Sequence, residues 1–148
     1  MTTRYCRAAV VACLLAASLT AFARKEETLQ ELIARAVAAR PDDRPALYVE
    51  VAQRQLQAAD DLYAAGKTEE AKAAVDGVVA YSEKAHDATV ESGKRLKQTE
   101  IAMRKMAAKL RDIRRTLNFE DQDPVQAAAD RLENLRTDLQ QRMFGKKK

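Results

Sequence analysis

Apolar residues recur three and four residues apart along most of the chain, which is the spacing of an amphipathic helix, and no useful stretch alternates as a strand does. Helices are predicted over approximately residues 26–39, 43–65, 68–117 and 124–143. Thr28 and Glu31 fit a capping box at the start of the first helix. Residues 24–144 are therefore expected to form one all-α domain.

The third predicted helix, residues 68–117, is unusually long and contains no proline. Counted in sevens, its apolar and small residues keep one register throughout. An unbroken register favours a continuous helix, and hence an elongated, coiled-coil-like bundle of helical hairpins built on this central helix. The alternative is a break near Gly93, which would leave segments suited to a compact four-helix bundle.

Small residues around the second predicted turn have a recognisable spacing, with Ala59 before the turn, Gly66 at the turn and Ala71 after it. With this spacing, residues 52–81 resemble one helix–turn–helix unit of the tetratricopeptide family. The resemblance implies a local hairpin with small residues where its helices cross. The chain departs from the family because Gln55 stands where a large aromatic residue is preferred, no proline closes the unit, and the second helix runs on. No second copy follows at the repeat offset, so a peptide-binding groove does not follow from the resemblance.

The N-terminal segment, residues 1–23, has the three parts of a secretory signal peptide. Arg4 and Arg7 supply the positive start, residues 8–19 are apolar, and a small-x-small motif ends at Ala23. Cleavage near Ala23 would make the protein periplasmic or secreted. The alternative is that the segment is retained as an N-terminal membrane anchor.

Charge is unevenly distributed along the chain that would follow cleavage. Basic and acidic side chains number 9 and 14 in residues 24–93, 9 and 2 in residues 94–117, and 6 and 6 in residues 118–148. Residues 145–148 form a short basic tail. The molecule is thus dipolar, and its basic segment has no aromatic residues interleaved with the cations, so we do not expect a nucleic-acid partner.

Few side chains of the expected mature chain carry catalysis or bind metals. Both cysteines, Cys6 and Cys13, lie in the signal segment, His86 is the one histidine, and the remaining serines are Ser82 and Ser92. A nucleophile with a base and an orienting group cannot be assembled from these residues, and a zinc site needs several His or Cys ligands. The sequence has no glycine-rich phosphate loop and no calcium loop. We therefore expect no enzyme activity, no metal and no cofactor.

Basic residues of the segment 94–117 fall outside the heptad core positions and recur on one side of the predicted helix. The candidate interaction surface consists of Lys97, Ile101, Arg104, Lys105, Arg111 and Arg115. Such a row is often a solvated helix face, but it could also bind an acidic protein or an anionic envelope surface. If residues 68–117 form one continuous helix, an antiparallel homodimer would place this row beside the acidic segment of a second copy.

These features predict a non-enzymatic, exported helical interaction or scaffold protein of a bacterial-type cell envelope, acting through a protein partner. One alternative is a periplasmic holdase-type chaperone, because the chain is similar in kind to small, basic, helical envelope chaperones, although it lacks their sequence signatures. The other alternative is a binder of anionic envelope surfaces.

Overall fold

The computed structural model describes residues 27–145, and within this range it contains helices and no strand, which confirms the all-α prediction. The described helices are α1 (Leu29–Ala38), α2 (Arg44–Ala64), α3 (Thr68–Ser92), α4 (Leu96–Thr116) and α5 (Phe119–Phe144). The predictions for residues 1–23 and 146–148 lie outside the described residues.

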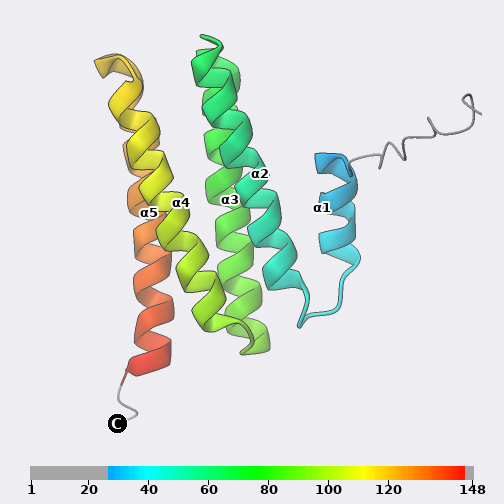
Figure 1. Ribbon diagram of the computed structural model, residues 1–148. Coiled ribbons are helices and arrows are strands. Elements are labelled where there is room, and N and C mark those ends of the chain that lie inside the picture. The colour runs from blue at the N-terminus through cyan, green and yellow to red at the C-terminus, as the bar shows by residue number, and fades with distance from the viewer. Residues whose placement is uncertain (1–26, 146–148) are drawn as a thin grey trace, which may run out of the picture.

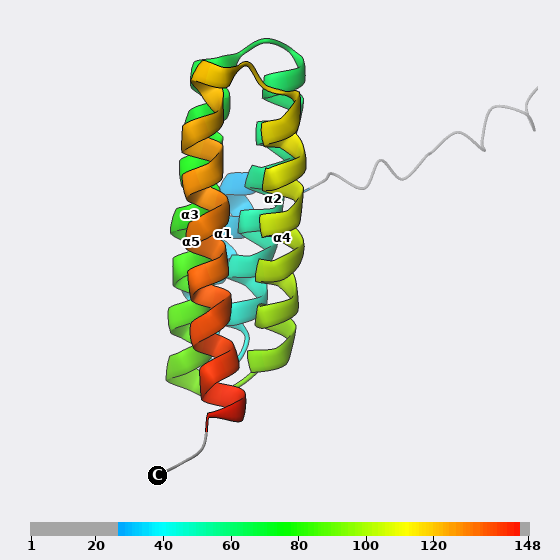
Figure 2. The same cartoon turned by 90° about the vertical axis from the view of Figure 1, so that its left-hand side faces the viewer.

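Helices α2 to α5 run alternately up and down and form two antiparallel hairpins, α2–α3 and α4–α5 (Figure 1). The hairpins pack against each other mainly through α3 and α5, which lie on one side of the bundle, while α2 and α4 lie on the other (Figure 2). The short helix α1 packs against α2 on the outside of this bundle. We call the end that carries the α3–α4 connection the lower end, as Figure 1 is drawn.

The prediction of one continuous helix over residues 68–117 is wrong, and the alternative break near Gly93 is correct. Gly93 adopts the left-handed conformation, with φ of 66°, and its N–H donates to the carbonyl of Thr89. Glycine adopts this backbone conformation without steric cost, which makes it a common helix terminator. The heptad register holds on both sides of the break, since α3 and α4 bury the same core positions. The hydroxyls of Thr89 and Thr99 lie 2.9 Å apart across the break.

The last helix begins before the position predicted for it. Helix α5 starts at Phe119, so Pro124 lies inside the helix and not at its first residue. Pro124 is the sixth residue of α5, so the helix lacks the hydrogen bond that an N–H at this position would donate to the carbonyl of Glu120. Glu120 and Asp121 in the first turn suit the positive end of the helix dipole. The first helix is also shorter than predicted, although its capping box between Thr28 and Glu31 is confirmed.

Gly77 lies inside α3 without breaking it and faces α2. A Cβ atom placed there would lie 2.8 Å from the end of the Gln55 side chain, which would have to move. The turn between these two helices is made by Gly66, which has a φ of 74° as expected from the sequence. The α2–α3 pair is therefore a close-packed helix–turn–helix hairpin.

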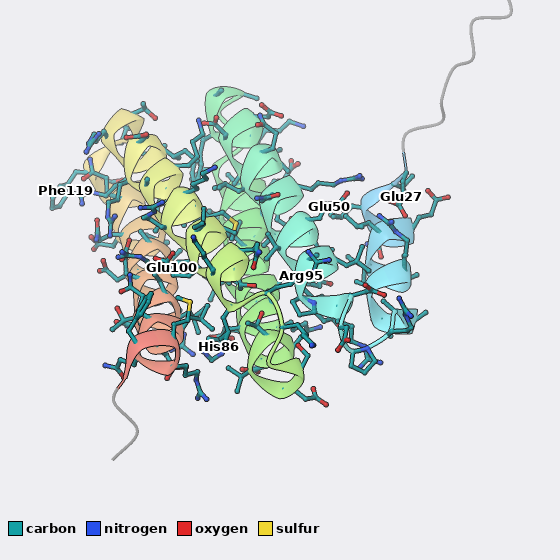
Figure 3. All side chains as sticks on the ribbon, turned by 60° about the horizontal axis from the view of Figure 1, so that its bottom comes forward. Glu27, Glu50, His86, Arg95, Glu100 and Phe119 are labelled. Atoms are coloured by element: carbon teal, nitrogen blue, oxygen red, sulfur yellow. The ribbon has the colours of Figure 1, made fainter. Side chains whose placement is uncertain are left out.

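The core of the bundle lies between the two hairpins. Its fully buried large side chains include Val75, Val78, Met103, Leu110, Val125 and Leu132. Helix α1 adds a separate contact, in which Leu32 and Ala36 are buried and Arg54 of α2 donates to the carbonyl of Glu27. Arg35 of α1 also forms an ion pair with Glu50 of α2 at 3.6 Å. Figure 3 labels Glu27 and Glu50, the two acidic residues of this contact.

Candidate interaction surface

All six residues of the predicted interaction surface lie on α4, but they do not share one environment. Lys97, Arg104, Lys105 and Arg115 are exposed, whereas Ile101 and Arg111 are half-buried. The inner face of α4 packs chiefly against α5 and more lightly against α2 and α3. The cations on the outer face differ in whether the neighbouring helices supply a partner.

The upper half of α4, residues 106–116, carries cations that are bonded to other side chains. Lys109 lies 2.6 Å from a carboxylate oxygen of Asp60 on α2, and this carboxylate raises the pKa of Lys109. Arg111 reaches Glu133 on α5 at 3.3 Å. On the same half, Arg114 donates to the amide oxygen of Gln126, and Arg115 pairs with Asp112 at 2.8 Å. The contacts of Lys109, Arg111 and Arg114 join α4 to neighbouring helices, and the pair of Arg115 with Asp112 balances its charge within α4.

The lower half of α4 and the connection before it, residues 94–105, carry cations without such partners. Within residues 27–145, no salt bridge involves Lys94, Arg95, Lys97, Arg104 or Lys105, and all five side chains are exposed. The one acidic residue of this segment, Glu100, is 8% exposed. Its carboxylate accepts from Arg136 at 2.7 Å and from Gln140 at 3.2 Å, so it points toward α5 and leaves the cations unpaired (Figure 3). We call these five cations, together with Ile101, the basic surface.

The start of α4 places positive charge where the helix dipole opposes it. Arg95 is the N-cap residue and adopts a left-handed conformation with φ of 62°, the one non-glycine residue to do so in the described part of the chain. It forms no side-chain cap, and the first turn of α4 has no acidic residue. By contrast, Glu69 and Glu70 occupy the first turn of α3. Since cations near a helix N-terminus cost about 0.3–1 kcal/mol each, the lower half of α4 is charged at the expense of helix stability.

His86 belongs to an ion-pair network between α3 and α5 that the sequence did not reveal. Its Nε2 lies 2.7 Å from Asp138 and its Nδ1 lies 3.0 Å from Asp87, so each ring nitrogen is within hydrogen-bond distance of a carboxylate. Asp138 also accepts from Arg142 at 2.6 Å. The pKa of Asp138 is lowered, first by Arg142 and then by His86. These contacts explain His86 as a residue that joins two helices.

The two serines of the described chain do not activate one another or the histidine. Ser92 donates to the carbonyl of Ala88 within its own helix. The hydroxyl of Ser82 is buried and has no hydrogen-bond partner. Neither hydroxyl is hydrogen-bonded to His86, whose two ring nitrogens face Asp87 and Asp138.

In the part of the chain that the structure describes, no set of three or more His, Cys, Asp and Glu residues lies close enough to hold a metal ion. None of the helices between residues 27 and 145 combines the length and apolar character needed to cross a membrane. No family model, curated protein or solved structure matches the chain.

Proposed function

We propose that this protein is a non-enzymatic helical interaction protein of the cell envelope, and that the basic surface on the lower half of α4 binds its partner. The observation that carries the proposal is the group of five exposed cations in residues 94–105 that have no carboxylate partner in the described structure. Export to the envelope is part of the proposal and rests on the signal-like pattern of residues 1–23.

The argument for a binding role is that the fold gains nothing from these charges. Elsewhere on α4, cations such as Lys109 and Arg111 contact carboxylates on neighbouring helices. On the basic surface the cations repel one another, and Lys94, Arg95 and Lys97 also lie at the positive end of the α4 dipole. Charges that weaken a fold and remain exposed are available to an anionic partner, for which they supply attraction and orientation.

The structure favours this surface over the other modes considered from the sequence. Antiparallel pairing of two copies relied on a continuous helix over residues 68–117, and the chain folds back at Gly93 instead. A holdase binds unfolded clients through apolar surface. Within residues 27–145, the exposed large apolar side chains are Val37, Phe119 and Phe144, on α1 and at opposite ends of α5, so they form no common patch.

Charge-reversed variants of the chain test the proposal. Full-length protein is immobilised and incubated with envelope extract at low salt, and the retained components are identified by mass spectrometry. The double substitution Lys97→Glu with Lys105→Glu changes the basic surface, while Lys67→Glu with Lys84→Glu makes the same change of net charge on the α2–α3 hairpin.

We expect the wild-type chain and the control variant to retain the same component, and the basic-surface variant to lose it. High salt should release it, because the Debye length falls from about 10 Å at 0.1 M to about 3 Å at 1 M, which screens the attraction between exposed charges. Equal retention by the two double variants would overturn the assignment of the basic surface.

A further inference from the structure

We propose that the partner of the basic surface is an anionic phospholipid bilayer, and that Phe144 enters the headgroup region beside the cations. This inference rests on the proposed function and names the class of partner. It follows from where the exposed aromatic residues lie relative to the charges, and from the absence of a central apolar cluster on the basic surface.

Phe144 lies at the same end of the bundle as the start of the basic surface. The last turn of α5 and the α3–α4 connection are both at the lower end in Figures 1 and 2. Gln140 of α5 donates to Glu100 of α4 at 3.2 Å, which sets the level at which the two antiparallel helices meet. One helical turn further, Phe144 on α5 reaches the level of the first turn of α4, where Lys97 lies.

The side chain of Phe144 is 79% exposed, although phenylalanine is normally buried. An exposed aromatic ring at the same level of the bundle as exposed cations suits a membrane interface, in which the ring enters the headgroup layer and the cations meet phosphates. The sequence continues after Gly145 with three more lysines.

The surface is less suited to a specific protein partner. Protein interfaces derive most of their affinity from a central cluster of apolar or aromatic side chains surrounded by polar residues. Here Ile101 is half-buried among exposed cations, and Phe144 lies at the edge of the surface, on the neighbouring helix. Long, separately exposed cations match a laterally mobile layer of phosphates, which needs no complementary shape.

The opposite end of the bundle offers a natural control. Phe119 is 84% exposed, nearly the same as Phe144, and it projects away from the bundle at the start of α5 (Figure 3). At this end the cations have carboxylate partners, as Lys72 has in Asp121 at 3.2 Å and Arg115 has in Asp112 at 2.8 Å, so it offers an anionic bilayer less unpaired positive charge than the lower end does. The bundle should therefore approach a bilayer with its lower end.

The experiment measures flotation of the full-length protein with vesicles at low salt. One vesicle preparation contains phosphatidylglycerol and phosphatidylcholine in equal amounts, and the other contains phosphatidylcholine alone. The measured quantity is the ratio of the two partition coefficients, because insertion of the apolar residues 8–19 into lipid contributes to both preparations.

We expect this ratio to be well above one for the wild-type chain and to fall at least about 25-fold in the Lys97→Glu, Lys105→Glu variant, because two cations are lost and the two new carboxylates are repelled. Each basic residue at an anionic surface contributes roughly a fivefold factor. The Lys67→Glu, Lys84→Glu variant should stay near the wild-type value. Phe144→Ser should weaken partition into the phosphatidylglycerol vesicles about fivefold, since the ring no longer transfers out of water, and Phe119→Ser should not.

The proposal is overturned if the wild-type ratio is near one, if the two double variants behave alike, or if Phe144→Ser and Phe119→Ser have equal effects. A ratio near one, combined with salt-sensitive capture from envelope extract that still requires Lys97 and Lys105, would identify an acidic protein as the partner and would leave the proposed function standing. If the basic-surface variant matches the control variant in both assays, the proposed function fails as well.

Discussion

The two halves of α4 carry similar side chains on their outer faces but use them differently. In the upper half, residues 106–116, Lys109 and Arg111 reach across to Asp60 and Glu133 on neighbouring helices. In the lower half, residues 94–105, the exposed cations have no such partner within the described structure, and the local carboxylate of Glu100 is turned toward α5. The same residue types are therefore structural in one half and available for binding in the other.

The inner faces of the two halves differ as well. The upper half buries Leu110 and Ile113 in the apolar core. The lower half also buries Met103 in this core, but beside it lie buried polar side chains, namely Thr99, bonded to Thr89, and Glu100, bonded to Arg136. Apolar packing thus anchors both halves, and buried polar contacts add to it in the lower half only.

The largest expected effect tests the apolar packing of the upper half. Leu110→Asp should lower the free energy of unfolding by about 4 kcal/mol, because it places an unpaired charge at a position that is 0% exposed. In the lower half the hydroxyl of the buried Thr99 is removed by Thr99→Val, which should lower the free energy of unfolding by less than about 1 kcal/mol. Thr89 keeps its hydrogen bond to the carbonyl of Ala85 in that variant. Urea denaturation measures both, and similar losses would contradict the contrast between the two inner faces.

Much of this fold can be predicted from local sequence patterns. The main error of the prediction came from a long-range pattern, the heptad register of residues 68–117. Caps and turns are decided by a few neighbouring residues, so the capping box at Thr28 and the turn at Gly66 were predicted correctly. The heptad register favoured a continuous helix over the break at Gly93, although a register indicates only which residues face a core. It does not report whether the chain continues or folds back onto that core.

The charges show the same limit. The sequence places nine basic residues in segment 94–117. Which of them remain free depends on residues far away in the chain, such as Asp60 for Lys109 and Glu133 for Arg111. These pairings exist only after the hairpins have packed, so a row of six candidate residues could be proposed from the sequence but could not be divided into bonded and unbonded members.

The second prediction concerns Glu100, the buried carboxylate of the lower half. Glu100→Ala should lower the free energy of unfolding by about 2 kcal/mol, a value between those of exposed and fully buried ion pairs. The substitution leaves Gln140 without this acceptor, while Arg136 keeps its contact with Glu133 at 3.0 Å. The control is Asp112→Ala, which removes an exposed pair with Arg115 and should change stability by less than about 0.5 kcal/mol. Equal effects in thermal or urea unfolding would show that Glu100 is not a structural contact.

The third prediction concerns a bonded cation of the upper half. Lys109→Glu should lower the free energy of unfolding by about 1 kcal/mol, because it breaks the pair with Asp60 and brings two carboxylates together. Lys105→Glu, one turn earlier on α4, removes a cation that has no salt-bridge partner and should be nearly neutral. The difference should shrink in high salt, since both sites are exposed to solvent. A loss for Lys105→Glu as large as that for Lys109→Glu would remove the distinction between the two halves.

The smallest expected effect has the opposite sign and separates binding from structure most sharply. Lys97 is the second residue of α4, beside the positive end of the helix dipole. Lys97→Glu should therefore raise the free energy of unfolding by about 0.5 kcal/mol at low salt, with Lys97→Gln in between. The same substitution should weaken attachment to anionic vesicles, so stability and binding would change in opposite directions. If Lys97→Glu instead destabilises the protein, then Lys97 contributes to the fold, and the argument that its charge is kept for a partner no longer holds.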